Sequence, residues 1–248
     1  CVQDNGEVVS TDKWLWSQWR AVWVCSRLYN TIERDQKWLD RALRIAEFCE
    51  RHGWLEQERG WALLLDQAGG LKRGYESIYV DAFAVYGMSE LARATGDQKW
   101  IERAEQTADE ALQKIRSLGD ALPHFPYAIA AETKPHGIPM IWSLKLATLG
   151  QASGHRRWLD ESHRMLAEID RDFYDPKEDR LRETVWRSGD AGDRDPAVAA
   201  TVPGHAIEGF WFRRVVEAGG VDEVVPATET WRRVQRHLDL GWDHAQGG

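Results

Sequence analysis

A tryptophan recurs near the start of four similar amphipathic segments, and this repeat constrains the fold more than any other feature of the sequence. The four residues are Trp38, Trp100, Trp158 and Trp231, spaced 62, 58 and 73 residues apart. Each interval has room for two helices and a loop, which is the size of a helical-hairpin repeat. Such a unit buries its apolar face against neighbouring units. The repeat therefore predicts an array of helical hairpins.

The spacing of apolar residues predicts an all-α chain. Apolar residues recur at helical spacing in most segments, and the alternation typical of strands is nearly absent. Between two of the predicted helices, Gly96 can adopt the left-handed conformation that ends a helix, and Asp97 can cap the next one. We predict eight helices, over residues 12–31, 36–52, 76–95, 98–117, 139–153, 156–172, 203–218 and 228–240.

Three long linkers, residues 53–75, 118–138 and 173–202, join the predicted hairpins at their other end. They are rich in Gly, Pro, His, Asp and aromatic residues. Long loops on a rigid scaffold commonly carry binding and catalytic residues. If the hairpins form a ring, the odd-numbered helices line its inside, the even-numbered helices form its outside, and the long loops gather at one mouth.

Composition and charge exclude several classes of protein. The 248 residues carry a net charge of −8, so nothing favours binding to nucleic acid or to an anionic membrane. No run approaches the ~18 to 20 apolar residues of a membrane-spanning helix. The cysteines, Cys1, Cys25 and Cys49, are too few and too scattered for a disulfide framework, which favours a reducing cytoplasm. The 14 tryptophans suit core filling and also stacking on sugar rings.

The two ends of the sequence suggest a fragment. The chain begins with Cys1 rather than methionine and ends with Gly247 and Gly248 directly after a patterned segment. We therefore expect a single domain over residues 1–248 that is incomplete at both ends.

A histidine followed three residues later by a glutamate is the strongest candidate for proton transfer. His205 and Glu208 share one face of the helix predicted from Pro203, so Glu208 can orient the imidazole or raise its basicity. A histidine that titrates near neutrality is well suited to act as a general base. The alternative is a histidine that caps its own helix. A metal site is disfavoured because no HExxH motif or ligand at i+4 spacing accompanies it.

Arg20 lies in the middle of a Trp-rich helix, on the face of Trp16 and Trp23. Its guanidinium either pairs with a carboxylate of the protein or binds the oxygen atoms of a ligand. Among the loop histidines, His124 and His136 could face the mouth of the ring. We expect the remaining helical histidines to be surface residues: His52, His155, His163 and His237.

Several spaced motifs resemble the N-acylglucosamine 2-epimerase family, which includes cellobiose 2-epimerases and mannose isomerases. The resemblance covers essentially the whole chain. It is carried by the segments Asp12–Trp23 with Arg20, Tyr79–Ala84, Ala92–Asp97, Gly137–Met140, Pro203–Trp211 and Gly241–Asp243.

The resemblance implies an (α/α)6 barrel of twelve helices, of which about eight fall in this chain. It also implies a cofactor-free isomerase that removes the proton beside the carbonyl of an open-chain reducing sugar and forms an enediolate. The proton then returns either to the opposite face of the same carbon, as in a sugar 2-epimerase, or to the neighbouring carbon, as in an aldose–ketose isomerase. His205 matches a catalytic histidine, Glu208 its partner, and Arg20 the residue that binds the carbonyl and enediolate oxygens. We take as substrate-binding candidates Trp16, Trp23, Tyr79, Asp81, Met140 and Trp211.

The sequence also departs from the family pattern. The second catalytic histidine belongs to helices that would follow Gly248, so we expect the 248-residue chain alone to be inactive. Met140 stands about where cellobiose epimerases carry a further histidine, which favours a monosaccharide over a disaccharide substrate. The full-length protein is a candidate homodimer in the cytoplasm, with no metal, nucleic-acid or membrane partner.

Two other functions remain open. A glycoside hydrolase on the same barrel would need two carboxylates across a pocket, for which Asp66, Asp81 and Glu183 are candidates. A non-catalytic helical-repeat module would instead bind a partner protein through a concave face.

Overall fold

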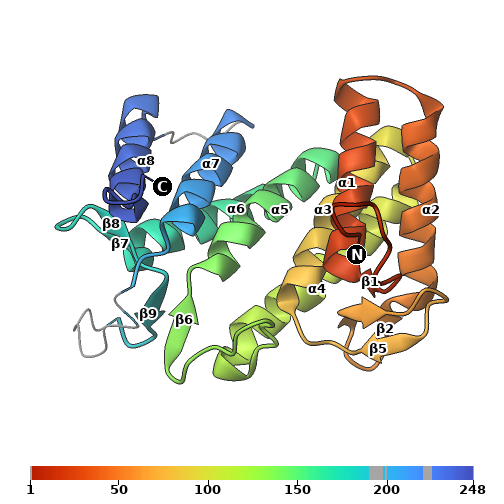
Figure 1. Ribbon diagram of the computed structural model, residues 1–248, viewed down its shortest axis with the longest axis horizontal. Helices are drawn as coiled ribbons and strands as arrows, with labels where there is room; N and C mark the ends of the chain where they lie inside the picture. Colours follow the sequence, from red (N-terminus) through yellow and green to blue (C-terminus); the bar gives the residue numbers. More distant parts are fainter. Residues whose placement is uncertain (1, 190–197, 199, 220–224, 248) are drawn as a thin grey trace. The chain divides into compact units, whose positions relative to one another are not determined.

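The predicted helices are present in the computed structural model, which describes residues 2–189, 198, 200–219 and 225–247 (Figure 1). None of the helices in this part of the chain is long and apolar enough to cross a bilayer. The described residues form eight α-helices: α1 Leu15–Thr31, α2 Gln36–His52, α3 Ile78–Thr95, α4 Gln98–Ser117, α5 Gly137–Ser153, α6 Arg156–Glu168, α7 Pro203–Ala218 and α8 Ala227–Gly241.

The long linkers contain short antiparallel strands, which the sequence pattern does not predict. The strands pair as β1-β4-β5, β2-β3, β6-β9 and β7-β8. Each has only two or three residues, too few for alternation to be visible. Their bounds are β1 Lys13–Trp14, β2 Trp54–Leu55, β3 Gly60–Trp61, β4 Leu64–Leu65, β5 Leu71–Arg73, β6 Thr133–Pro135, β7 Tyr174–Asp175, β8 Arg180–Leu181 and β9 Thr184–Trp186.

The chain divides into two compact units, residues 1–128 with 152–154 and residues 129–151 with 155–248. In the first unit, α1 packs against α2 and α3, and α3 packs against α4. Helix α2 has one buried face and one solvent-facing side. Its buried residues form a single stripe: Leu39, Ala42, Ala46 and Cys49. In contrast, α3 is buried on almost every face between Ile78 and Ala92, as an inner helix would be.

Two helices begin later than predicted because the preceding residues are held in extended conformation. The predicted start of α1 at residue 12 is wrong, since Lys13 and Trp14 pair with β4. The predicted start of α3 at residue 76 is wrong by two residues. Glu76 accepts a backbone hydrogen bond from Phe125, and the hydroxyl of Ser77 donates to the carbonyl of Phe125.

In the second unit, α7 packs against α8, and α6 continues as a π-helix over Ile169–Phe173. Helix α5 is buried along its length from Gly137 to Gly150. A Cβ on Gly150 would lie 2.8 Å from a side-chain atom of Leu159, so the glycine allows α5 and α6 to approach closely. Strand β6 runs into α5, while β9 precedes α7, and their pairing holds the two approaches together.

Candidate active site

His205 is the third residue of α7, and its ring is held by a carboxylate from outside that helix. Its Nδ1 lies 3.0 Å from Oε1 of Glu183, the residue before β9. The side chain of His205 remains half exposed. The hydrogen bond with Glu183 raises the pKa of His205 above its ordinary value despite partial burial, and the charges of Glu183 and Glu208 add to this effect.

Glu208 acts on His205 in one of the two ways that its spacing in the sequence allows. It is exposed on α7, and its influence on the pKa of His205 is that of a nearby charge. Of the two roles expected for Glu208, raising the basicity of His205 agrees with this charge effect, while the hydrogen bond to the ring is made by Glu183. A separation of three residues brings two side chains to one helix face, but here the contact is made across the loop.

His136, directly before α5, is fully buried next to this pair. Its backbone N–H donates to the carbonyl of Glu183, with 2.8 Å between nitrogen and oxygen. Its ring packs edge-on against Phe173, with 5.7 Å between ring centroids. Burial lowers the pKa of His136 to about 3, with smaller contributions from the charges of His205 and His237. The ring is therefore neutral at physiological pH.

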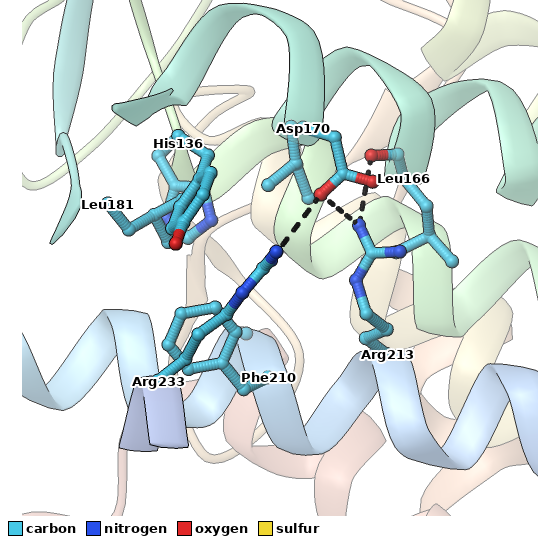
Figure 2. Close-up of a pocket in the computed structure, with 10 residues that line it drawn as sticks. His136, Leu166, Asp170, Leu181, Phe210, Arg213 and Arg233 are labelled. Carbon is cyan, nitrogen blue, oxygen red and sulfur yellow. Dashed lines mark hydrogen bonds and ion pairs between the residues drawn. The ribbon is translucent and has the colours of Figure 1, made fainter. Parts of the chain in front are cut away.

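His136 lines a small cavity of about 10 Å³ beside α7, together with an ion-pair network (Figure 2). Arg213 contacts Asp170 at 2.7 Å, and Arg233 approaches the same carboxylate at 3.9 Å. Gly209 of α7 makes room for the imidazole, because a Cβ at this position would lie 3.2 Å from Cε1 of His136. A space of this size holds about one water molecule.

The prediction that His237 is a surface residue is wrong. The side chain is fully buried on α8. Its Nδ1 donates to the carbonyl of Arg233 at 2.7 Å, and its Nε2 accepts from the N–H of Leu181 at 2.9 Å. His237 thus joins α8 to β8 and serves the packing of the second unit.

Arg20 lies in the first unit, where its guanidinium stacks 3.9 Å from the ring centroid of Phe83 on α3. The residue is exposed. A cation over an aromatic face is stabilised by the ring quadrupole. Phe83 thus helps orient the flat guanidinium on α1.

The aromatic substrate-binding candidates of the first unit contact other aromatic rings. Trp16 stacks on Trp14 with 5.5 Å between centroids, and Trp23 stacks on Tyr86 with 4.6 Å. The hydroxyl of Tyr79 lies 2.6 Å from Nε2 of His124. Because Nδ1 of His124 faces a backbone carbonyl, it carries the hydrogen, and Tyr79 donates to Nε2.

The other three substrate-binding candidates differ sharply in exposure. Asp81 is fully buried and accepts hydrogen bonds from the N–H of Trp61 and the hydroxyl of Tyr75. Burial raises the pKa of Asp81 to about 6. Met140 is 3% exposed in the first turn of α5, whereas Trp211 on α7 is 56% exposed.

The carboxylates considered for glycoside hydrolysis are all hydrogen-bonded to other groups of the protein. Asp66 accepts backbone hydrogen bonds from Ala68 and Gly70 in its own turn, Asp81 is enclosed as described, and Glu183 is bonded to His205. Among the described residues, no group of three or more His, Cys, Asp or Glu side chains is arranged to hold a metal ion. A histidine that is hydrogen-bonded to a carboxylate, as His205 is to Glu183, is able to accept and release a proton.

Comparison with known proteins identifies the family. The family model described as N-acylglucosamine 2-epimerase (GlcNAc 2-epimerase) matches residues 1–248. The chain belongs to the N-acylglucosamine 2-epimerase family. The N-acylglucosamine 2-epimerase of Bos taurus is 27% identical in an alignment of 265 positions, which covers 100% of this chain and 60% of that protein. The chain thus spans about 60% of the length of the curated relatives that it matches.

Solved structures of similar proteins confirm the fold class. A sugar epimerase from a ruminal bacterium has a TM-score of 0.75 at 18% identity, covering 96% of this chain and 62% of its own. The cellobiose 2-epimerase of Bacillus thermoamylovorans has the same TM-score at 14% identity, covering 96% and 64%. These likenesses identify the fold of this N-acylglucosamine 2-epimerase family member as that of the (α/α)6 barrel enzymes.

Proposed function

We propose that the full-length protein is a sugar 2-epimerase that acts on a free reducing sugar of the N-acylglucosamine type. Membership of the family supports the class of reaction. The observation that carries the proposal is the half-exposed imidazole of His205, with Nδ1 3.0 Å from Glu183 at the start of α7. A histidine in this state can accept a proton at neutral pH.

In the proposed reaction, His205 removes the proton from C2 of the open-chain sugar. The electron pair of the C–H bond moves toward the carbonyl and gives an enediolate, and the proton resides on the imidazole. A second acid on the other side of the sugar, the second histidine that the family resemblance implies, donates a proton to the opposite face of C2. The imidazolium of His205 then releases its proton to solvent, which completes the epimerisation and accounts for exchange of the C2 hydrogen. We propose that Glu208 contributes its negative charge to the imidazolium and that its carboxylate is not required to orient the ring.

Arg20 is the proposed stabiliser of the enediolate oxygens. A fixed cation that meets developing negative charge lowers the barrier without reorganising. The guanidinium lies 3.9 Å from the ring centroid of Phe83, and this contact restrains it on α1.

The decisive experiment measures the exchange of the C2 hydrogen with solvent. The full-length protein is incubated in heavy water with a panel of N-acyl amino sugars, free aldoses and cellobiose, and deuterium at C2 is followed by NMR. We expect exchange and epimer formation with a monosaccharide of this panel. Release of a new reducing end from a glycoside, without exchange at C2, would instead identify a hydrolase.

The variant His205→Ala tests the assignment of the base, with His244→Ala as its control. His244 is an exposed histidine outside the helices. General base catalysis contributes about 10²- to 10⁴-fold, so His205→Ala should lose at least about a hundredfold in exchange rate. The control should retain its rate. Wild-type exchange in His205→Ala would remove this residue from the mechanism.

A further inference from the structure

We propose that Glu183 is the positioning residue of His205: it keeps the hydrogen on Nδ1 and thereby makes Nε2 the basic nitrogen that meets the substrate. The catalytic meaning of this assignment rests on the function proposed above. The orientation of the ring, however, can be tested without any turnover.

The hydrogen bond defines the tautomer. The 3.0 Å contact joins Nδ1 of His205 to a carboxylate oxygen of Glu183. An ionised carboxylate only accepts hydrogen bonds, so the hydrogen lies on Nδ1. In a neutral imidazole the other nitrogen is then unprotonated, and Nε2 becomes the base. When Nε2 takes up a proton, the positive charge forms next to a fixed negative charge, as in other histidine–carboxylate pairs of enzymes.

Hydrogen bonds on two sides hold the main chain at Glu183, from which its carboxylate reaches His205. Its N–H donates to the carbonyl of Ala200, shortly before α7, and its carbonyl accepts from the N–H of His136, directly before α5. Both distances are 2.8 Å. The next residues along the chain, Thr184–Trp186, form β9 and pair with β6. Glu183 therefore continues the pairing of β6 with β9 and helps join the segments that lead into α5 and α7.

Glu208 provides the matched comparison. It has the same charge and also acts on the pKa of His205, but it is exposed and does so through its charge alone. The described titratable groups around His205 are thus Glu183 before β9, Glu208 on α7 itself and neutral His136 before α5. Of these groups, Glu183 is hydrogen-bonded to the ring.

The test is an NMR titration of His205 in the wild-type chain, in Glu183→Gln and in Glu208→Gln. Glutamine keeps the shape of the side chain and leaves the backbone hydrogen bonds intact, so we expect the fold to be retained. Amide spectra of the two variants and the wild type check this. The ring nitrogen shifts report the tautomer, and the titration midpoint reports the charge stabilisation. His205→Ala assigns the signals.

We expect the wild-type ring to be the Nδ1–H tautomer with a pKa above 6.5. Glu183→Gln should lower this midpoint more than Glu208→Gln does. An unchanged midpoint in Glu183→Gln, or a larger change in Glu208→Gln, would overturn the proposal. So would a wild-type ring protonated on Nε2.

Kinetics of the full-length protein then separate positioning from a structural role. In Glu183→Gln, kcat for exchange at C2 should fall with KM little changed, because the base is weakened while the contacts that bind the sugar are kept. The acidic limb of the pH profile should move to lower pH along with the NMR midpoint. A wild-type protein that exchanges no sugar would refute the proposed function, while the NMR result would still decide whether Glu183 orients His205.

Discussion

Replacing His136 by leucine should remove a pH-dependent loss of stability at low pH. The imidazole is fully buried, and burial lowers its pKa from 6.5 to about 3. The folded state therefore favours the neutral ring. The stability that depends on this neutral ring is complete above about pH 6.5 and is lost as the pH falls toward the folded-state value, because the unfolded chain takes up the proton first.

The magnitude follows from the two pKa values. Between pH 7.5 and pH 5, the unfolded chain becomes almost fully protonated at this position, whereas the folded chain stays about 99% neutral. Linkage then gives about 2 kcal/mol of lost stability for the wild-type protein. Leucine carries no titratable group, so the variant escapes this part of the acid destabilisation.

Urea unfolding at both pH values measures the effect in wild type, His136→Leu and His244→Leu. The free energy of unfolding of His136→Leu, taken relative to wild type, should rise by about 2 kcal/mol on going from pH 7.5 to pH 5. His244 is exposed, and its variant should follow the wild type. A constant difference between His136→Leu and wild type at the two pH values would show that His136 titrates normally and would refute the assigned burial.

Three further predictions concern stability. In the same assay, the free energy of unfolding of Asp81→Asn, taken relative to wild type, should rise by about 1 kcal/mol from pH 5 to pH 8. Burial raises the pKa of the Asp81 carboxyl to about 6, so the stability that the protonated carboxyl gives to wild type is lost as the pH rises through that value. A difference that does not change with pH would contradict this. Trp19→Ala should lower the free energy of unfolding by ~3–5 kcal/mol because the ring is fully buried, whereas Trp211→Ala should lower it by less than about 1 kcal/mol. Equal losses for the two variants in thermal unfolding would contradict the burial of Trp19. Gly87→Ala should lower the melting temperature, since its Cβ would lie 2.7 Å from the carbonyl oxygen of residue 19. Gly204→Ala has open space around its Cβ and should raise the melting temperature slightly. The reverse order of melting temperatures would refute the packing of α1 on α3.

The helices could be predicted from the sequence because their signals are local. The observed bounds of α2 and α4 equal the predicted ones. Gly96 has a φ of 70°, and the side chain of Asp97 accepts from the N–H of Lys99, as the capping pattern predicts. An amphipathic stripe with a cap at each end needs no distant partner to be recognised.

The site could be predicted only in part because its decisive contact is not local. His205 was recognisable from its motif, and helical spacing then favoured Glu208, three residues away. The contact with Glu183 spans 22 residues and depends on the pairing of β6 with β9, which begin 51 residues apart. Strands of two or three residues are too short to show alternation in the sequence, and their register leaves no periodic signal either. His237 was misjudged for the same reason, since its partner Leu181 lies 56 residues earlier.

The two backbone hydrogen bonds of Glu183 have a consequence for how this site can change. They use the backbone carbonyl, which every residue has, and the backbone N–H, which every residue except proline has. The main chain at residue 183 is thus held by groups that do not belong to its side chain. A substitution there alters the chemistry presented to His205 while the main chain stays where it was. Position 183 can therefore carry an acid, an amide or a hydroxyl on the same main chain. The basicity of the His205 imidazole can be changed by mutation there while the scaffold is kept.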